Sequence, residues 1–228
     1  MTTFFIDSGL RSSTARNDRR VPTNPSCLPD VTMALEKYRQ KRNFERTPEP
    51  GGEEATSAGQ GPLFVVQKHA ARRLHYDFRL QIGDVLKSWA VPKGPSPEPA
   101  DKRLAVETED HPLDYGSFEG VIPKGEYGAG AVLLWDRGSW KPEGNAETAW
   151  RRGHISFRLD GEKLKGRWSL IRTGGRESRN WLLIKSDDDY AGTDWSTAEA
   201  QSSVLSGRTL EEIAGSPAHL WHSDSGSQ

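Results

Sequence analysis

Residues 67–80, which read QKHAARRLHYDFRL, constrain the fold of this chain more than any other stretch. In its second half apolar and polar side chains alternate strictly, with Leu74, Tyr76, Phe78 and Leu80 on one parity and His75, Asp77 and Arg79 on the other. A period of two is typical of a strand that is buried on one face. We therefore expect a strand whose apolar face packs on a core and whose other face presents an imidazole, a carboxylate and a guanidinium.

The polar face of this strand offers the donors of a metal site next to an anion site. Alternate residues of a strand lie about 6.6 Å apart, so His75 and Asp77 can share one ion while Arg79 reaches an adjacent anion. His69 supplies a third ligand if residues 70–73 turn the chain back. Two neutral imidazoles and one carboxylate suit Mn²⁺, Fe²⁺ or Zn²⁺. The alternative is a solvent-facing surface that serves only solubility and cross-strand pairing.

Short strand-like runs follow one another from Leu63 onward. They cover residues 64–68, 74–82, 85–91, 104–109, 118–122, 131–135, 155–159, 167–172 and 181–185. Gly83-Asp84, Asp160-Gly161 and Gly174-Gly175 have the composition of hairpin turns. The one helical pattern among these runs, residues 146–152, is short, which argues against a parallel α/β sheet. The sequence predicts a mainly β fold, an antiparallel barrel or sandwich with short peripheral helices.

Less orderly segments flank the predicted β domain. We divide the chain into a disordered extension (1–30), a short helix and linker (31–62), the β domain (63–190), a C-terminal segment with a short helix (191–214) and a tail (215–228). The extension is poor in apolar residues and contains three prolines, and Met33 is an alternative start. The first helix is expected over residues 32–44, and a capping box at residues 209–212 predicts the last one.

Charge and cysteine content limit the classes of function. The formal net charge is −1, so attraction to an anionic partner must come from a local cluster of cations. Cys27 is the single cysteine, which excludes an internal disulfide framework and fits a reducing compartment. No apolar run approaches the roughly 18 residues of a membrane span, and residues 4–6 are too few for a signal-peptide core. We expect a cytoplasmic protein with no membrane partner.

A second segment, Glu109 to Tyr115, carries another candidate histidine. Pro112 fixes a turn after His111, and Tyr115 lies four residues further on, where it can share a site with the imidazole. His111 could be a ligand, a general acid, a donor to a phosphate oxygen or a solvated loop residue. Cations that can rim such a site are Lys93 and Lys124, each between a Pro and a Gly, with Arg72, Arg73, Arg103 and Arg137. A basic rim around a metal site suits a phosphate-bearing polymer.

Four motifs, in this order and spacing, resemble the 3′-phosphoesterase module of bacterial DNA ligase D: QKHAARRLHYDFRL, WAVPKGPS, ETEDHPLDYGSFEG and IPKGEYGAG. The resemblance covers roughly residues 33–214, including the closing SGRTLEEIA. It implies a small antiparallel β-barrel with a crescent groove. It also implies a Mn²⁺-dependent enzyme of non-homologous end joining, which removes a terminal ribonucleoside from a DNA 3′ end and then hydrolyses the remaining 3′-phosphate to 3′-OH.

The resemblance also implies roles for single residues. His69, His75 and Asp77 would bind the metal, Arg79 and His111 would hold the phosphate, and Tyr115 would assist the phosphomonoesterase step. Supporting groups would be Arg42, Glu49, Gln67, Lys93, Arg103 and Glu109. One departure concerns the family's N-terminal K-R-D-F, which here reads Lys41-Arg-Asn-Phe44. If the missing Asp serves the ribonucleoside step, the chain with Asn43 is weaker in that step than in the phosphatase step.

The implied partners are DNA 3′ ends, a separately encoded ATP-dependent DNA ligase and Ku, for a monomer associated with the nucleoid. We expect a stand-alone module, because these residues include no nucleotidyl-lysine motif and no length for a polymerase. Two alternatives come from other classes. One is a non-haem iron oxygenase that uses His75, Asp77 and His111. The other is a non-catalytic module that binds DNA ends through the same groove.

Overall fold

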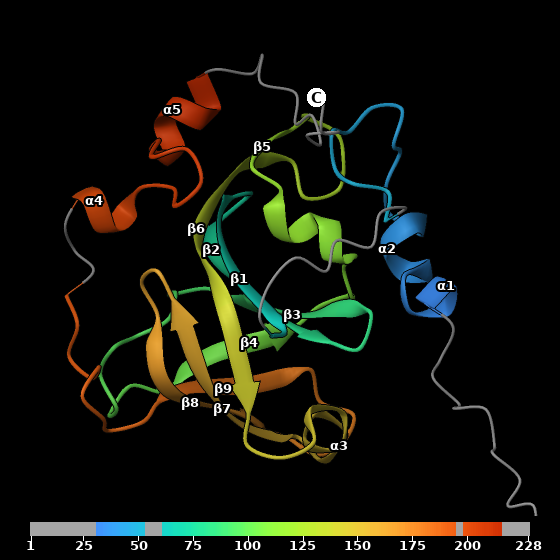
Figure 1. The fold of residues 1–228 in the computed structure, drawn as a ribbon. Coiled ribbons are helices and arrows are strands. Elements are labelled where there is room, and N and C mark those ends of the chain that lie inside the picture. The colour runs from blue at the N-terminus through green and yellow to red at the C-terminus, as the bar shows by residue number, and fades with distance from the viewer. Residues whose placement is uncertain (1–30, 53–60, 195–197, 216–228) are drawn as a thin grey trace, which may run out of the picture.

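The computed structural model describes residues 31–52, 61–194 and 198–215 (Figure 1). The expected disordered extension, residues 1–30, lies outside these ranges, as does nearly all of the expected tail. The described strands are β1 (Leu63–Ala70), β2 (Leu74–Ile82), β3 (Val85–Val91), β4 (Arg103–Glu107), β5 (Gly120–Ile122), β6 (Gly130–Pro142), β7 (His154–Gly161), β8 (Lys165–Arg172) and β9 (Asn180–Lys185). All their pairings are antiparallel.

These strands close into a barrel. The hydrogen-bonding order is β1-β2-β3-β4-β9-β8-β7-β6-β5, and the additional pairing of β1 with β6 joins the ends of an eight-stranded ring. β5 pairs with the first residues of β6 and stands outside that ring. The predicted β-barrel is confirmed, and the sandwich alternative is excluded. The strand expected over residues 118–122 shortens to β5, because residues 113–117 form the 3₁₀ helix η1 (Leu113–Ser117).

The hairpins set the register that builds the site. Ile82 pairs with Val85, so Gly83 and Asp84 form the expected two-residue turn, with Gly83 at φ 63°, a value that favours glycine. Between β1 and β2, His69 lies directly opposite His75, so the chain turns back as the third-ligand hypothesis required. The expected Asp160-Gly161 turn is displaced: β7 continues to Gly161, and residues 162–164 connect it to β8.

The displaced turn is held by a buried carboxylate. Asp136 of β6 is 0% exposed. Its Oδ1 accepts hydrogen bonds from the backbone N–H groups of Arg137 (2.9 Å) and Lys163 (3.0 Å). Its Oδ2 accepts one from the N–H of Leu164 (2.7 Å). Asp136 therefore joins the middle of β6 to the β7–β8 connection, a link that no local sequence pattern announces.

The barrel interior is filled by aromatic and branched side chains. Phe78 and Leu80 are fully buried there, as the alternation in β2 predicts, whereas Leu74 at the tip of the β1–β2 hairpin is 49% exposed. Trp89 and Trp135, expected in the core, are both buried. The ring of Trp89 packs edge-on against that of Trp181, with centroids 5.6 Å apart. Full burial of such side chains stabilises a fold by several kcal/mol each, roughly 3–5 by truncation to Ala.

A second apolar cluster lies on the outer face of the barrel. It joins Val65, Leu86, Val132 and Leu134 of the strands to the side chains that cover them: Tyr38, Leu113, Tyr115, Phe118 and Ile122. This cover counts against the alternative of a solvent-facing polar strand surface, because only 8% of Asp77 and 2% of Arg79 remain exposed. The polar face of β2 is therefore an interior surface, on which charges need partners.

Short helices surround the strands in Figure 1. The helix expected over residues 32–44 is two short ones, α1 (Val31–Ala34) and α2 (Glu36–Gln40). The helix expected at residues 146–152 is α3 (Ala146–Arg152), and α4 (Ala198–Gln201) and α5 (Leu210–Gly215) follow. The capping box at the start of α5 is confirmed, since Thr209 and Glu212 exchange backbone-to-side-chain hydrogen bonds of 2.8 and 3.3 Å. No helix in the described part of the chain is long and apolar enough to span a membrane.

Candidate active site

Three potential metal ligands converge near the turn of the β1–β2 hairpin. His69 Nδ1 lies 3.5 Å from Asp77 Oδ2, and His75 Nε2 lies 3.6 Å from Asp77 Oδ1. One donor atom from each of the three residues lies within 4.8 Å of the others. Donors bound to one ion at about 2.1 Å in a tetrahedral arrangement are about 3.4 Å apart, so this set fits a single divalent ion.

Backbone carbonyls orient both imidazoles toward that point. His69 Nε2 is 2.7 Å from the carbonyl oxygen of Gly128, and His75 Nδ1 is 2.9 Å from that of Arg73. A carbonyl only accepts, so each of these ring nitrogens carries the proton and donates it. The lone pairs of His69 Nδ1 and His75 Nε2 therefore face the Asp77 carboxylate. Lone pairs turned toward a carboxylate repel it unless a cation lies between them, and hydrogen bonds of this kind typically orient metal-binding histidines.

Asp77 is ionised in this setting. Burial alone would raise the pKa of its carboxyl group, but neighbouring positive charge, chiefly the Arg79 guanidinium, outweighs burial and holds the pKa well below its usual range. The carboxylate thus keeps its charge at neutral pH. Two neutral imidazoles and one carboxylate form a donor set that fits a divalent transition-metal ion.

Arg79 stands next to the ligands with its guanidinium fixed on several sides. Its Nε donates to Gln67 Oε1 (2.9 Å), its Nη1 donates to Ser88 Oγ (2.7 Å), and its Nη2 lies 3.3 Å from Asp77 Oδ2. Gln67 donates in turn to the carbonyl oxygens of Tyr115 and Phe118. Sequence reasoning missed Ser88, although the two-residue turn between β2 and β3 places it directly opposite Arg79.

His111 lies between two guanidinium groups. Its Nδ1 lies 2.9 Å from both the carbonyl oxygen of Glu109 and Arg79 Nη1, and its Nε2 lies 3.3 Å from Arg42 Nη2. Burial, Arg79 and Arg42 lower the pKa of this imidazole well below 6.5, so His111 is neutral. The metal-ligating group of the described residues pairs His75 and Asp77 with His69 and not with His111. That arrangement counts against the oxygenase alternative.

Tyr115 completes the cluster. Its Oη donates to Glu49 Oε1 (3.0 Å), and its ring lies 4.9 Å from the guanidinium carbon of Arg79. Burial and Glu49 raise the pKa of this phenol well above 10, so it keeps its proton. Glu49 also binds Arg42 (2.8 Å). It comes from the segment expected to be a linker, in which Thr47 and Glu49 are instead buried.

Comparison with known proteins gives a consistent result. Residues 67–172 match the family described as DNA Ligase D 3′-phosphoesterase domain. The multifunctional non-homologous end joining protein LigD of Pseudomonas aeruginosa is 54% identical over 182 residues, which cover 77% of this chain and 22% of that protein. This chain resembles the phosphoesterase module of bacterial DNA ligase D.

Two further relatives agree with the phosphoesterase resemblance. The multifunctional non-homologous end joining protein LigD of Mycolicibacterium smegmatis is 46% identical over 164 residues, 69% of this chain and 21% of that protein. The multifunctional non-homologous end joining DNA repair protein LigD of Mycobacterium tuberculosis is 47% identical over 161 residues, 70% of this chain and 21% of that protein. The chain spans about a fifth of the length of these relatives.

A groove of about 990 Å³ collects the main candidates of the phosphoesterase-like domain. It is lined by His69, His75, Asp77, Arg79, His111 and Tyr115, together with Arg42 and Glu109. The structure therefore brings together the six residues that sequence reasoning placed at the centre, and their roles remain predictions. Glu49 and Gln67 are buried behind them and contact Tyr115 and Arg79.

The expected basic rim is only partly assembled. Arg72, Arg73 and Lys124 line the groove. Lys93 does not line it and is exposed in the turn after β3, and Arg103 also lies outside it, paired with Asp101 at 2.7 Å. Arg137 lies elsewhere too, 3.8 Å from Glu162. A Pro-Lys-Gly pattern restricts the backbone around a lysine. Whether that lysine lies near the groove depends on the fold, and only Lys124 of the two lines it.

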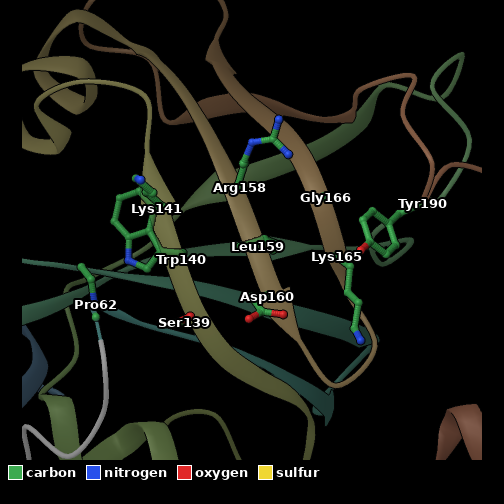
Figure 2. Close-up of a pocket in the computed structure, with 11 residues that line it drawn as sticks. Pro62, Ser139, Trp140, Lys141, Arg158, Leu159, Asp160, Lys165, Gly166 and Tyr190 are labelled. Carbon is green, nitrogen blue, oxygen red and sulfur yellow. The ribbon is translucent and has the colours of Figure 1, made fainter.

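A second hollow on the barrel is separate from the groove. It has a volume of about 560 Å³ and lies on the outer face of β6, β7 and β8 (Figure 2). Its lining includes Lys141, Arg158, Asp160 and Tyr190, and none of the candidate site residues. Among the described residues, the candidate metal ligands and Arg79 thus line the groove at β1 and β2 and not this second hollow.

Proposed function

We propose that this protein is a metal-dependent phosphoesterase that heals DNA 3′ ends. It removes a 3′-terminal ribonucleoside and hydrolyses the resulting 3′-phosphate to 3′-OH. The observation that carries the proposal is the set of two backbone-oriented imidazoles and one ionised carboxylate, directly beside the buried guanidinium of Arg79. The similarity to LigD proteins, named for non-homologous end joining, supports a role in that repair process.

The first requirement of this reaction is to neutralise the phosphate. A phosphate monoester carries nearly two negative charges at neutral pH, and its uncatalysed hydrolysis is among the slowest biological reactions. A divalent ion held by His69, His75 and Asp77 would supply Lewis-acid stabilisation of the charge on the phosphoryl oxygens. We propose Mn²⁺ as that ion, because the mixed nitrogen and oxygen donor set suits it.

Arg79 is proposed to stabilise the developing charge on the phosphoryl group. Gln67 and Ser88 hold its guanidinium in one orientation before substrate arrives, so little reorganisation is needed during the reaction. The ring of Tyr115 lies against the guanidinium and limits its movement. His111, neutral in the free protein, is proposed to bind a phosphoryl oxygen, because a dianionic phosphate favours its protonated, donating form. A 3′-terminal ribonucleoside also offers its 2′-OH for recognition.

The proposal is tested with a duplex whose recessed 3′ strand ends in either one ribonucleotide or a 3′-phosphate. With Mn²⁺ we expect both ends to be converted to 3′-OH, and His75→Ala to convert neither, as resolved on a denaturing gel. A protein that binds this duplex but converts neither end with any divalent ion would be the non-catalytic end-binding module instead. The proposed ligase and Ku partners are tested separately, by adding each protein to a joining reaction.

Asn43 yields a prediction about the balance of the two activities. Its Oδ1 accepts a hydrogen bond from the N–H of Glu45 (3.1 Å), which an Asp can also accept, so Asn43→Asp changes charge with little change in structure. We expect Asn43→Asp to raise the rate of ribonucleoside removal about tenfold, the effect of one additional charged hydrogen bond, without changing phosphate hydrolysis. The measurement is the ratio of initial rates on the two ends. An unchanged ratio would show that this position has no part in the ribonucleoside step.

A further inference from the structure

The groove contains an exposed aromatic ring that the proposed chemistry does not use. Tyr127 is 50% exposed. Several large hydrophobic side chains are exposed in the described part of the chain, and among them Tyr127 is the one that lines the groove. Tyr127 is not part of the hydrophobic core and carries no charge, so its position beside the candidate site suggests a role in binding.

The position of Tyr127 is tied to the metal ligands. It lies in the connection from β5 to β6, one residue before Gly128, whose carbonyl oxygen orients His69. Gly125 and Gly128 adopt φ values of 98° and 79°, which favour glycine and restrict the path of this connection. Glu126, the residue before Tyr127, pairs with Arg46 at 3.1 Å. The backbone of Tyr127 is thus fixed next to the residue that orients His69, one of the candidate metal ligands.

Two cations lie near the Tyr127 ring. The guanidinium carbon of Arg42 is 5.7 Å from the ring centroid. Lys41 Nζ lies 3.3 Å from Tyr127 Oη and 4.6 Å from the ring centroid. Lys41 is held in turn by Glu109 at 3.0 Å. These contacts limit the freedom of the ring before any ligand binds, and the residue as a whole remains 50% exposed.

We propose that Tyr127 is a stacking platform for a nucleobase at the 3′ end of the DNA substrate. This inference rests on the proposed function and specifies how that substrate is held. Arg72, Arg73 and Lys124 offer the groove charges for phosphates, but a base offers an aromatic face, which Tyr127 matches. Stacking accepts every base, because each has a π-face, and an enzyme that acts on broken ends must be equally tolerant of sequence.

The test compares Tyr127→Ala and Tyr127→Phe on two 3′-phosphate substrates, one with a normal terminal base and one with an abasic terminal nucleotide. We expect Tyr127→Ala to raise KM for the normal substrate about tenfold with little change in kcat, and Tyr127→Phe to resemble wild type. On the abasic end, wild type and Tyr127→Ala should have similar KM values. Tyr190→Ala is the matched control, since Tyr190 is 48% exposed but lies outside the groove.

Other outcomes overturn the inference. Equal losses on both substrates, or a fall in kcat alone, would mean that the ring supports the connection that orients His69. No loss on either substrate would mean that the ring is idle. If the wild type hydrolyses neither substrate, the proposed function fails, and the inference is decided by fluorescence-anisotropy Kd values: base-dependent binding lost in Tyr127→Ala supports it, and base-independent binding refutes it.

Discussion

Asp77→Asn is expected to lower hydrolysis of a DNA 3′-phosphate on the order of a thousandfold, the largest loss that this structure predicts for a near-isosteric change. The substitution replaces one carboxylate oxygen by an NH₂ group, which cannot ligate a cation, and removes the negative charge between two imidazoles and Arg79. The two histidines then have no anionic ligand to join them, and the guanidinium loses its ion pair.

Two measurements separate this loss from misfolding. Isothermal titration with Mn²⁺ should show binding to the wild type and at least tenfold weaker binding to Asp77→Asn, since even partners outside the ligand set change metal affinity by about 10–100-fold. Asp160→Asn is the control, because Asp160 is an exposed residue of β7 that lines the second hollow and not the groove. Turnover of Asp77→Asn within tenfold of wild type would remove Asp77 from the metal site.

Asp136→Ala is expected to lower the free energy of unfolding by about 3 kcal/mol, although it lies outside the active groove. Three backbone N–H groups lose their acceptor, in a region where Asp136 itself is fully buried. For a chain of this size the midpoint of thermal unfolding should fall by about 6–12 °C. Scanning calorimetry measures the change, and Asp189→Ala, at an exposed position, should leave the midpoint nearly unchanged.

The Asp136 carboxyl group should also make the free energy of unfolding fall as the pH rises. Burial raises the pKa of Asp136 to about 6, against backbone hydrogen bonds that lower it. Because this pKa lies above the unfolded value of 3.8, the favourable contribution is full below pH 3.8 and is lost as the pH rises through 6. The stability advantage of wild type over Asp136→Asn should therefore shrink between pH 4 and pH 7 in urea unfolding. An advantage that grows over this interval would mean that the backbone donors outweigh burial.

The alternation in β2 was enough to predict the barrel strand and its polar face, because side-chain direction along a strand follows from backbone geometry alone. The spacing of His69 and His75 predicted their meeting for a similar reason, since a hairpin is a local structure. The burial of Asp77 and Arg79 could not be predicted in this way. It depends on α2 and η1, which are distant from β2 in sequence and pack onto the outer face of the barrel.

The positions of the supporting residues likewise depend on contacts between segments that are distant in sequence. Arg42 and Glu49 were inferred from motif resemblance and not from their surroundings in the sequence, since a Gly- and Pro-rich stretch gives no sign that its first residues are buried. Lys93 and Arg103 do not line the groove, because charges that are close along a chain need not be close in space, and their supporting roles remain predictions. Tyr127 was visible within the IPKGEYGAG motif, but its exposure beside the groove is a property of the fold.

The three candidate ligands come from one hairpin, whereas the barrel is closed by pairing β1 with β6 much further along the chain. A hairpin forms in microseconds, while pairings between distant strands close slowly. The ion-binding point can therefore take shape in a nascent chain, ahead of the cooperative closure of the ring. A metal that binds it at that stage would favour one β1–β2 register early, and so act on the order of folding events as well as on the chemistry of the finished site.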